Sequence, residues 1–307
     1  MNVVLAKRRG LGFAACFLAS GLWGCGFFFG KIALAEMNVG AMVFYRFMFA
    51  VLVLSPVLLT HKPGLNRREW RTLLIASFLG VPLQFLLQFY GLSLTTVSHA
   101  SLMVGTMPVI LAVGAGIFAH ERMDGIGWVA LAGSTIGAAL IALGGHGGGK
   151  GEATLAGDLW VVFSLLIALG WILMNKQLME KHSPIVVTAY GLFAGTAMLV
   201  VVVPVLFGWP PVAHVSAKAW WALAGSGVLC TATTTFLWNW GMTQVPASQA
   251  GVLLNMEPLV GSVLGVVVLG ETLGPSAWVG GGMILAAAVT LTMHSKTRVG
   301  EQLVVGS

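Results

Sequence analysis

Residues 91–121 read GLSLTTVSHASLMVGTMPVILAVGAGIFAHE, and residues 241–271 read GMTQVPASQAGVLLNMEPLVGSVLGVVVLGE. The two stretches align without a gap at a spacing of 150 positions, and each has a glycine at its start, a proline inside it and a glutamate at its end. Matched leucines and valines mean little in an apolar chain, but a matched proline and a matched acid are informative. The alignment therefore indicates a duplicated unit.

The same spacing of 150 extends the match beyond these stretches. Trp70 matches Trp220, and Trp128 matches Trp278. Because tryptophan is rare, these two pairs strengthen the case for duplication over residues 70–138 and 220–288. The other matches are Ser98/Ser248, Ala100/Ala250, Leu73/Leu223, Leu79/Leu229, Leu87/Leu237, Val113/Val263, Val129/Val279 and Ala138/Ala288.

The composition is typical of a membrane protein. Hydrophobic residues make up 57% and charged residues 8% of the 307 residues, whereas a soluble domain has about 25% charged residues. The mean hydropathy of +0.91 argues against a single soluble core. Apolar runs of about 20 residues recur, enough for a helix to cross the hydrocarbon layer. We expect ten such helices, over 11–34, 39–60, 70–93, 99–119, 125–145, 157–178, 185–208, 218–242, 247–270 and 274–294.

The expected fold class is an all-α integral membrane protein with ten transmembrane helices as two inverted five-helix repeats. Five helices per repeat is an odd number, so the second copy enters the membrane upside down, and a site between inverted repeats is expected near the midplane. The expected parts are a first repeat over 1–145, a linker over 146–156, a second repeat over 157–296 and a cytoplasmic tail over 297–307.

The basic residues predict the topology. The formal net charge is +6, but only Lys31, Lys150 and Lys218 fall on the outer side if the N-terminus is inside. This positive-inside pattern predicts a multi-pass protein of the cytoplasmic (inner) membrane with both termini cytoplasmic. The expected partner of the positive charge is the lipid bilayer, and not nucleic acid. The inner-side residues are Lys7, Arg8, Arg9, Lys62, Arg67, Arg68, Arg71, Arg122, Lys176, Lys181, Lys296 and Arg298.

Several motifs resemble the drug/metabolite transporter superfamily, specifically its EamA-type permeases. ASGLWG at 19–24 resembles the first-helix motif of that family, and YRF at 45–47 resembles its second-helix arginine motif. PASQA at 246–250, MEPL at 256–259 and LGE at 269–271 resemble its ninth-helix signature. The resemblance implies ten helices in two inverted repeats and the outward movement of small metabolites or drugs. Within that family, the chain most resembles bacterial exporters of amino acids, including aromatic ones.

Polar and aromatic side chains recur at helical spacing inside the expected helices. Gln84 and Gln88 share one helix face, as do Trp171 and Asn175. Hydrogen bonding between helices explains any one of these residues, but the whole set favours a cavity, because unsatisfied amides in lipid are costly. The candidate substrate-binding residues are Trp23, Tyr45, Arg46, Gln84, Gln88, Met103, Trp171, Asn175, Tyr190, Trp238, Asn239 and Asn255.

Arg46 and Glu257 are the charges placed deepest in the expected helices. A charge near mid-membrane costs about 3 kcal/mol or more, so each needs a partner. A mutual ion pair that holds the two repeats together is one explanation. Substrate binding is the other, and for Glu257 also proton coupling.

The predicted function is export of small metabolites by alternating access, with aromatic or neutral amino acids, or related compounds, as substrates. A doubly charged phosphate ester would need several basic residues. One arginine, one glutamate, amides and aromatic rings instead suit a zwitterion with an apolar body. Drug or cation efflux and an uncoupled facilitator are the alternatives.

An integral-membrane enzyme is the remote alternative. Such an enzyme needs clustered histidine, acidic or cysteine residues near one membrane face, and the sequence contains no such cluster. Cys16, Cys25 and Cys230 are odd in number and lie in apolar segments, so they predict neither a disulfide nor a metal framework. We therefore expect no catalytic residue, no metal and no cofactor.

Overall fold

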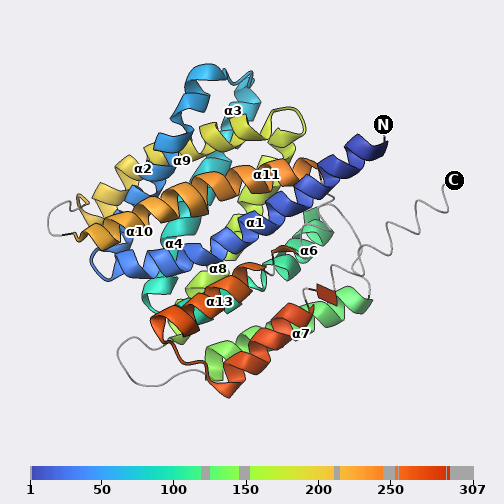
Figure 1. The fold of residues 1–307 in the computed structure, drawn as a ribbon, viewed down its shortest axis with the longest axis vertical. Coiled ribbons are helices and arrows are strands. Elements are labelled where there is room, and N and C mark those ends of the chain that lie inside the picture. Colours follow the sequence, from blue (N-terminus) through green and yellow to red (C-terminus); the bar gives the residue numbers. More distant parts are fainter. Residues whose placement is uncertain are drawn as a thin grey trace.

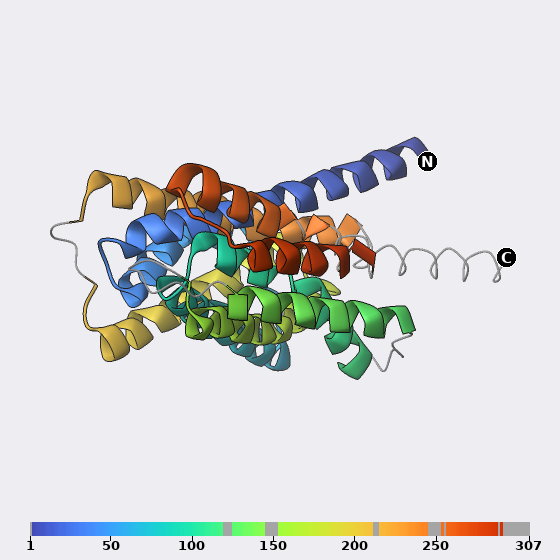
Figure 2. The same cartoon turned by 90° about the horizontal axis from the view of Figure 1, so that it is seen from below.

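The computed structural model of residues 1–307 is a bundle of helices (Figures 1 and 2). It describes residues 2–118, 125–144, 153–210, 215–244, 253–254, 256–287 and 289–290, and the regular structure in these ranges is helical. Figure 1 shows α1 lying beside α11 across the molecule. It also shows α7 beside the helix over 275–287 at the lower edge.

The first half of the chain consists of helices joined by short connections. A π-helical segment, η1, continues α3 into α4 without a break. A turn at 105–106 separates α5 from α6, directly before the segment that carries Pro108. The bounds are α1 Asn2–Leu34, α2 Val39–Thr60, α3 Arg67–Phe78, η1 Leu79–Leu83, α4 Gln84–Ser93, α5 Val97–Val104, α6 Met107–Phe118 and α7 Gly125–Gly144.

The second half repeats this order. A second π-helical segment, η2, joins α10 to α11, and a further helix covers 275–287. Helical residues therefore occur in each of the ten ranges expected from the sequence. The bounds are α8 Leu155–Met179, α9 Pro184–Phe207, α10 Ala217–Gly227, η2 Val228–Thr233, α11 Thr234–Gln244 and α13 Met256–Leu269.

Five helices in the described part of the chain are long and apolar enough to cross a membrane. Each has at least 22 residues, whereas about 20 are needed to span the hydrocarbon layer. Apolar helical stretches at Val97–Leu111, Trp128–Gly137 and Met256–Leu269 are shorter. The five long segments are Gly10–Leu34, Val39–Thr60, Arg67–Ser93, Leu155–Met179 and Pro184–Phe207.

The duplication predicted from the spacing of 150 is visible in local structure. Asn66 caps α3 by accepting from the N–H of Glu69, and Ser216, 150 positions later, caps α10 by accepting from the N–H of Ala219. The two π-helical segments also coincide, because Leu79–Leu83 maps onto 229–233, within η2. The two copies therefore share a cap and an irregular helical turn at matched positions.

Polar contacts show that the repeats run in opposite directions. Nζ of Lys31, in the last turn of α1, donates to the carbonyl of Thr95, whose hydroxyl donates to Asp158 in the first turn of α8 at 2.6 Å. The end of α1 therefore lies beside the start of α8. Because α8 is the first helix of the second repeat, as α1 is of the first, the two repeats are inverted. At the opposite end of the bundle, Lys181 follows α8 and lies 3.6 Å from Glu69 at the start of α3. We call these ends the Asp158 side and the Glu69 side.

Contacts between helices of one repeat and helices of the other hold the bundle together, and some of these pairs recur at matched positions. α1 packs along α11, and their counterparts α8 and α4 also pack together. α2 contacts its own counterpart α9, and α5 contacts α13. Each of these contacts joins one repeat to the other, so the apolar core is shared between them. α7 lies at the edge of this arrangement (Figure 1).

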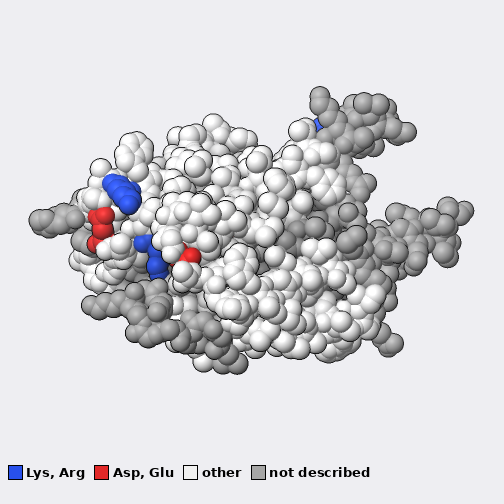
Figure 3. All heavy atoms as spheres, turned by 60° about the horizontal axis from the view of Figure 1, so that its bottom comes forward, with Lys and Arg blue, Asp and Glu red and all other residues white. Residues whose placement is uncertain are grey.

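The surface is suited to lipid. Figure 3 shows a broad face whose centre is uncharged, with its acidic residues and most of its basic residues near one end. Large apolar side chains are more than 60% exposed on several helices. A soluble protein rarely exposes so much apolar surface, whereas a bilayer supplies its contacts. Examples are Leu52, Val201, Val205, Trp221 and Val267.

Candidate functional site

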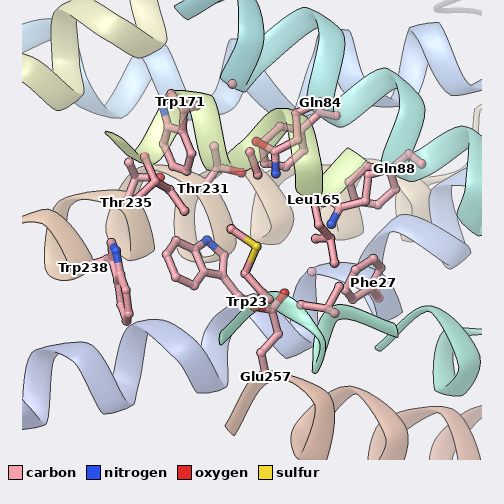
Figure 4. A pocket seen from close by; sticks show the side chains of 18 of the residues that line it. Trp23, Phe27, Gln84, Gln88, Leu165, Trp171, Thr231, Thr235, Trp238 and Glu257 are labelled. Atoms are coloured by element: carbon pink, nitrogen blue, oxygen red, sulfur yellow. The ribbon is translucent and has the colours of Figure 1, made fainter. Parts of the chain in front are cut away.

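A cavity lies at the centre of the bundle, between the two repeats (Figure 4). Its walls come from α1, α2, η1, α4, α5, α6, α8, α9, η2, α11 and the start of α13. Among the described residues, those of α7 and of the helix over 275–287 contribute nothing to the lining. The first and second repeats therefore form the cavity together.

The cavity gathers part of the predicted site. Asn255 lies outside the described residues. Five predicted residues lie outside the lining, namely Tyr45, Met103, Asn175, Tyr190 and Asn239. The predicted residues that line it are Trp23, Arg46, Gln84, Gln88, Trp171, Trp238 and Glu257.

Arg46 on α2 is only 2% exposed. Its Nε donates to Oγ1 of Thr231 at 2.7 Å, and its Nη2 donates to the carbonyl of Cys230 at 3.1 Å. The guanidinium carbon lies 4.9 Å from the ring centre of Phe85 and 5.0 Å from that of Phe89, which are cation–π distances. The guanidinium is therefore held by hydrogen bonds to the second repeat and by aromatic rings of the first.

The π-helical segment η2 supplies the acceptors for Arg46. The N–H of Thr234 donates to the carbonyl of Leu229, five residues back, and bypasses Cys230, four residues back. The Cys230 carbonyl accepts from Arg46. Thr231 donates its hydroxyl to the carbonyl five residues earlier at 3.0 Å while accepting from Arg46. Such π-turns recur at functional sites, and here the turn presents two oxygens to a buried cation.

Glu257 lies in the first turn of α13, and its side chain points toward the cavity near Trp23 (Figure 4). In the described part of the chain its carboxylate has neither a hydrogen bond nor an ion-pair partner. Arg46 borders the same cavity but forms no ion pair with Glu257. The direct pair that the sequence left open is therefore absent from this conformation.

Two amides of α4 border the cavity. Gln84 is 7% exposed and Gln88 is 6% exposed. Oε1 of Gln84 is buried without a hydrogen-bond partner in the described structure. An unpaired buried polar atom is costly, and this oxygen is itself closed off from solvent, so a ligand in the cavity could reach it only after a rearrangement of the wall.

Tryptophan side chains form the apolar part of the wall. The ring centres of Trp23 on α1 and Trp238 on α11 are 5.4 Å apart and tilted by 53°. Trp171 on α8 packs directly on Gly80 in η1, where a Cβ atom would overlap the indole ring. Glycine is therefore required at position 80 for α8 to approach this closely. Large indole faces of this kind can hold an apolar body or a cation.

The two predicted tyrosines instead bridge helix ends. The Tyr45 hydroxyl donates to the carbonyl of Pro210 at 3.2 Å. The Tyr190 hydroxyl donates to the carbonyl of His61, just past the end of α2, at 3.0 Å. Arg46 and Phe47 both line the cavity, and at about 100° per residue Tyr45 lies on the other side of the helix from the direction between them.

The remaining predicted residues pack between helices. The Asn239 amide on α11 donates to the Thr188 hydroxyl on α9 at 2.7 Å. Met103 on α5 and Asn175 on α8 are buried outside the cavity lining. Interhelical hydrogen bonding, which the sequence analysis kept as an alternative for each polar residue, accounts for Asn239.

The Asp158 side carries polar contacts between the repeats. Nδ1 of His99 on α5 lies 3.1 Å from Asp158 of α8, and both side chains are buried. Glu271, after α13, accepts from the N–H groups of Val97 and Ser98 at 2.8 Å each, and from the Ser98 hydroxyl at 2.7 Å. These contacts join the start of α5 to the start of α8 and to the end of α13.

Phe85 and Phe89 are site residues that sequence reasoning missed. They lie one turn apart on α4, and the guanidinium of Arg46 lies over their rings. Phenylalanines at this spacing look like an ordinary apolar helix face, so the sequence carries no signal for the contact with Arg46. Thr231 was recognisable as part of a polar stripe on its helix, but its pairing with Arg46 depends on how the repeats pack.

Two inverted helical repeats around a shared central cavity are typical of membrane transporters. The chain belongs to the EamA-like transporter family, whose sequence profile matches residues 10–143 and 155–293. The resemblance of the motifs is therefore confirmed, and each match covers one repeat. Together with the long apolar helices, this makes the chain a multi-pass membrane transporter.

Known proteins agree with this assignment. An uncharacterized transporter of Archaeoglobus fulgidus is 29% identical, over 88% of this chain and 93% of the relative. A probable terminal-alkyne amino-acid exporter of Streptantibioticus cattleyicolor is 28% identical over 65% of each chain. The threonine/homoserine exporter RhtA of Escherichia coli is 28% identical over 70% of this chain and 74% of its own. A crystal structure with a TM-score of 0.65 and 18% identity covers 95% of this chain and 98% of its own, and supports the fold.

Proposed function

We propose that this protein exports small metabolites across the cytoplasmic (inner) membrane by alternating access, and that its substrates are neutral or aromatic amino acids or closely related compounds. The central cavity carries the proposal, because both repeats line it with aromatic rings, amides and a single unpaired acid. Amino-acid exporters among the relatives support it. The proposed substrate-contacting residues are Trp23, Gln84, Gln88, Trp171, Trp238 and Glu257.

The proposed topology has ten membrane spans and cytoplasmic termini. Basic residues cluster on the Glu69 side, whereas Glu36, Asp158 and Glu271 lie on the other. The positive-inside rule therefore favours the Glu69 side as the cytoplasmic one. The Glu69-side residues are Lys62, Arg67, Arg68, Arg71, Lys176 and Lys181. The division into repeats at 1–145 and 157–296, with a linker at 146–156 and a tail at 297–307, belongs to the same proposal.

Alternating access requires the polar contacts on the Asp158 side to part when substrate leaves outward. Asp158 and Glu271 link the starts of α5 and α8 to the end of α13. Rocking of one inverted repeat against the other would separate these contacts and open the cavity. Hydrogen bonds in a short cluster are easily exchanged for bonds to water, so this end is suited to open and close.

Counterflow in proteoliposomes tests the proposal. L-phenylalanine, L-threonine and a cationic drug are each preloaded, and uptake of the labelled compound is measured. A carrier of amino acids gives saturable counterflow with phenylalanine or threonine. Counterflow of the drug alone would support drug efflux, and unsaturable flux would support a channel. Empty liposomes provide the baseline.

Glu257 is the proposed proton-coupling residue. A carboxyl group that faces a cavity without a partner can exchange protons with water there. An imposed pH gradient should therefore drive transport by the native protein, and Glu257→Gln should lose this drive while counterflow persists at saturating substrate. Glu180→Gln, at an exposed position on the Glu69 side, is the matched control. Equal pH-driven flux in native protein and Glu257→Gln would support an uncoupled facilitator.

A further inference from the structure

We infer that the cavity recognises the ammonium group of its substrate through Glu257, and that Arg46 is a positioning residue that does not bind the substrate carboxylate. This inference rests on the proposed function and specifies its substrate class. The substrate carries a protonated amine on an apolar body, and its carboxylate is dispensable. Amines and amino-acid esters then belong to the same class of ligands as amino acids.

The surroundings of Arg46 are those of a structural residue. Its side chain is 2% exposed, and two of its N–H groups bind oxygens of η2. Phe85 and Phe89 lie within cation–π distance of the guanidinium. A carboxylate that reached Arg46 would compete with bonds that tie α2 to the second repeat.

The oxygens that Arg46 binds also have a structural origin. The N–H of Thr234 bypasses the Cys230 carbonyl, and Thr231 uses its hydroxyl proton for a carbonyl within its own helix. Arg46 supplies donors to both groups at 3.1 and 2.7 Å. The arginine therefore stabilises the irregular turn. Thr196 lies 150 positions after Arg46, on α9, and donates its hydroxyl to the carbonyl of Leu192 within its own helix, so the arginine has no counterpart at that position.

Glu257 has the opposite character. Its carboxylate borders the cavity and forms neither a hydrogen bond nor a salt bridge within the described chain. A carboxylate accepts and does not donate, whereas an ammonium group donates three hydrogen bonds and accepts none. The carboxylate of Glu257 therefore matches an ammonium group.

The aromatic wall fits the same ligand. Trp23 adjoins Glu257 in Figure 4, and Trp238 lies 5.4 Å from Trp23 between ring centres. Indole faces attract cations and cover apolar groups. An amine next to Glu257 would thus place its hydrocarbon body against these rings. A ligand without the positive charge would leave Glu257 unpaired in an apolar surrounding, which is unfavourable.

Two derivatives of one amino acid test the inference. Phenethylammonium has the amine and ring of phenylalanine without the carboxylate, and N-acetyl-L-phenylalanine has the ring and carboxylate without the charged amine. Each is added as a competitor of phenylalanine counterflow. Phenethylammonium should inhibit at a concentration similar to that of phenylalanine, and the N-acetyl compound should be weaker by about tenfold or more, as expected for loss of a charge-assisted hydrogen bond. Equal inhibition by the N-acetyl compound, or none by phenethylammonium, overturns the inference.

Thermal unfolding of the purified protein in detergent gives a test that does not require transport. A ligand that binds the folded state raises the unfolding midpoint. Phenethylammonium should raise it, and N-acetyl-L-phenylalanine at the same concentration should not. A shift with the N-acetyl compound alone overturns the inference. Absence of amino-acid counterflow together with a phenethylammonium shift would instead defeat the proposed export of amino acids and leave amine recognition standing.

Two variants separate the roles of the charges. Glu257→Gln keeps the shape of the side chain. It should weaken inhibition by phenethylammonium by about tenfold or more and leave inhibition by the N-acetyl compound unchanged. Arg46→Lys keeps the charge but loses the planar fork. It should lower the unfolding midpoint and the maximal transport rate, with the same ratio between the two competitors as in the native protein. If Arg46→Lys selectively strengthened or weakened inhibition by the carboxylate-bearing competitor, Arg46 would contact the substrate, and its positioning role would be overturned.

Discussion

Nε of Arg46 donates a hydrogen bond to Oγ1 of Thr231 across 2.7 Å, and this bond joins α2 of the first repeat to η2 of the second. Thr231 in turn donates to the carbonyl of Ser226 within its own helix. A single hydroxyl thereby connects a buried cation to a π-turn. The link crosses the boundary between the repeats, so its strength affects both the stability of the bundle and the shape of the cavity.

Thr231→Val should destabilise the protein, because valine has nearly the same shape but leaves Nε of Arg46 without an acceptor. Hydrogen bonds to charged groups contribute about 1.5–3 kcal/mol, so a loss of about 2 kcal/mol is expected. Thr231→Ser keeps the hydroxyl and is the matched control. The measurement is the thermal unfolding midpoint in detergent. A valine variant as stable as the serine variant would contradict a structural role for this hydrogen bond.

Glu271→Ala should loosen the Asp158 side. The carboxylate accepts three hydrogen bonds from Val97 and Ser98 at the start of α5, at 2.7 to 2.8 Å. Removing it leaves buried donors unpaired, at a cost of about 1–3 kcal/mol. Glu180→Ala, an exposed acid on the opposite side, is the control and should change the unfolding midpoint little. Equal midpoints for the two variants would show that the Glu271 contacts add no net stability.

The two-repeat architecture was predictable because duplication leaves a fixed spacing in the sequence. Asn66 and Ser216 illustrate this, since each caps a helix and they lie 150 positions apart. The π-turns were not predictable. Pro82 lies in η1, but its counterpart in η2 is Ala232, so no residue type marks both turns. The energetic difference between an α-turn and a π-turn depends on packing around it, which the local sequence does not encode.

Membership of the cavity was only partly predictable. Thr231, Thr235 and Asn239 share one helical stripe, yet only the two threonines line the cavity. Asn239 lies a turn further along and pairs with Thr188 of α9. Helical spacing gives the face of a helix but not the depth at which a neighbouring helix covers it. That depth is set by contacts between repeats, which are distant in sequence.

Glu36→Gln should reduce stability in a pH-dependent manner. The hydroxyl of Ser216 and then its N–H donate to the Glu36 carboxylate, at 2.6 and 2.7 Å, and they lower the pKa of this carboxyl below its ordinary value. A lowered folded-state pKa gives stability that is present above the unfolded-state pKa and is lost as the pH falls through the folded-state value. The native protein should therefore exceed the variant in unfolding midpoint near neutral pH, and the difference should vanish in acid.

Midpoints measured across this pH range check the sign of the effect. Glu180→Gln has no such partner in the described structure and should track the native protein at every pH. A gap between native protein and Glu36→Gln that widens in acid would refute the role of the ionised carboxylate at the start of α10.

Gly91→Ala should disrupt the crossing of α4 and α8. A Cβ at position 91 would lie 2.8 Å from the carbonyl oxygen of Gly157 and 2.9 Å from the backbone nitrogen of Val161. Because backbone atoms cannot move aside as a side chain can, we expect the added methyl group to destabilise the folded protein by about 1–3 kcal/mol. Gly282→Ala is the control, because a Cβ there meets nothing within 4 Å. A lowered unfolding midpoint in Gly91→Ala alone supports the close approach, and equal midpoints argue against it.

Cysteine labelling should distinguish the cavity wall from the packed helix contacts. Gln88 and Thr235 border the cavity, whereas the Asn239 amide donates to Thr188 outside it. In a background with Cys16, Cys25 and Cys230 replaced by alanine, Gln88→Cys and Thr235→Cys should therefore react with a small aqueous thiol reagent, and Asn239→Cys should stay inert. The three native thiols are removed because they would add their own signal.

Protection by ligand makes the labelling specific to the cavity. Phenethylammonium should slow the reaction of Gln88→Cys and Thr235→Cys, because an amine held at Glu257 occupies the space that the reagent must enter. An exposed position such as Glu180→Cys should react rapidly with or without the amine, since it lies outside the bundle. If Asn239→Cys reacts while the two cavity positions stay inert, water reaches the bundle by another route, and the central cavity is not the path that substrate takes.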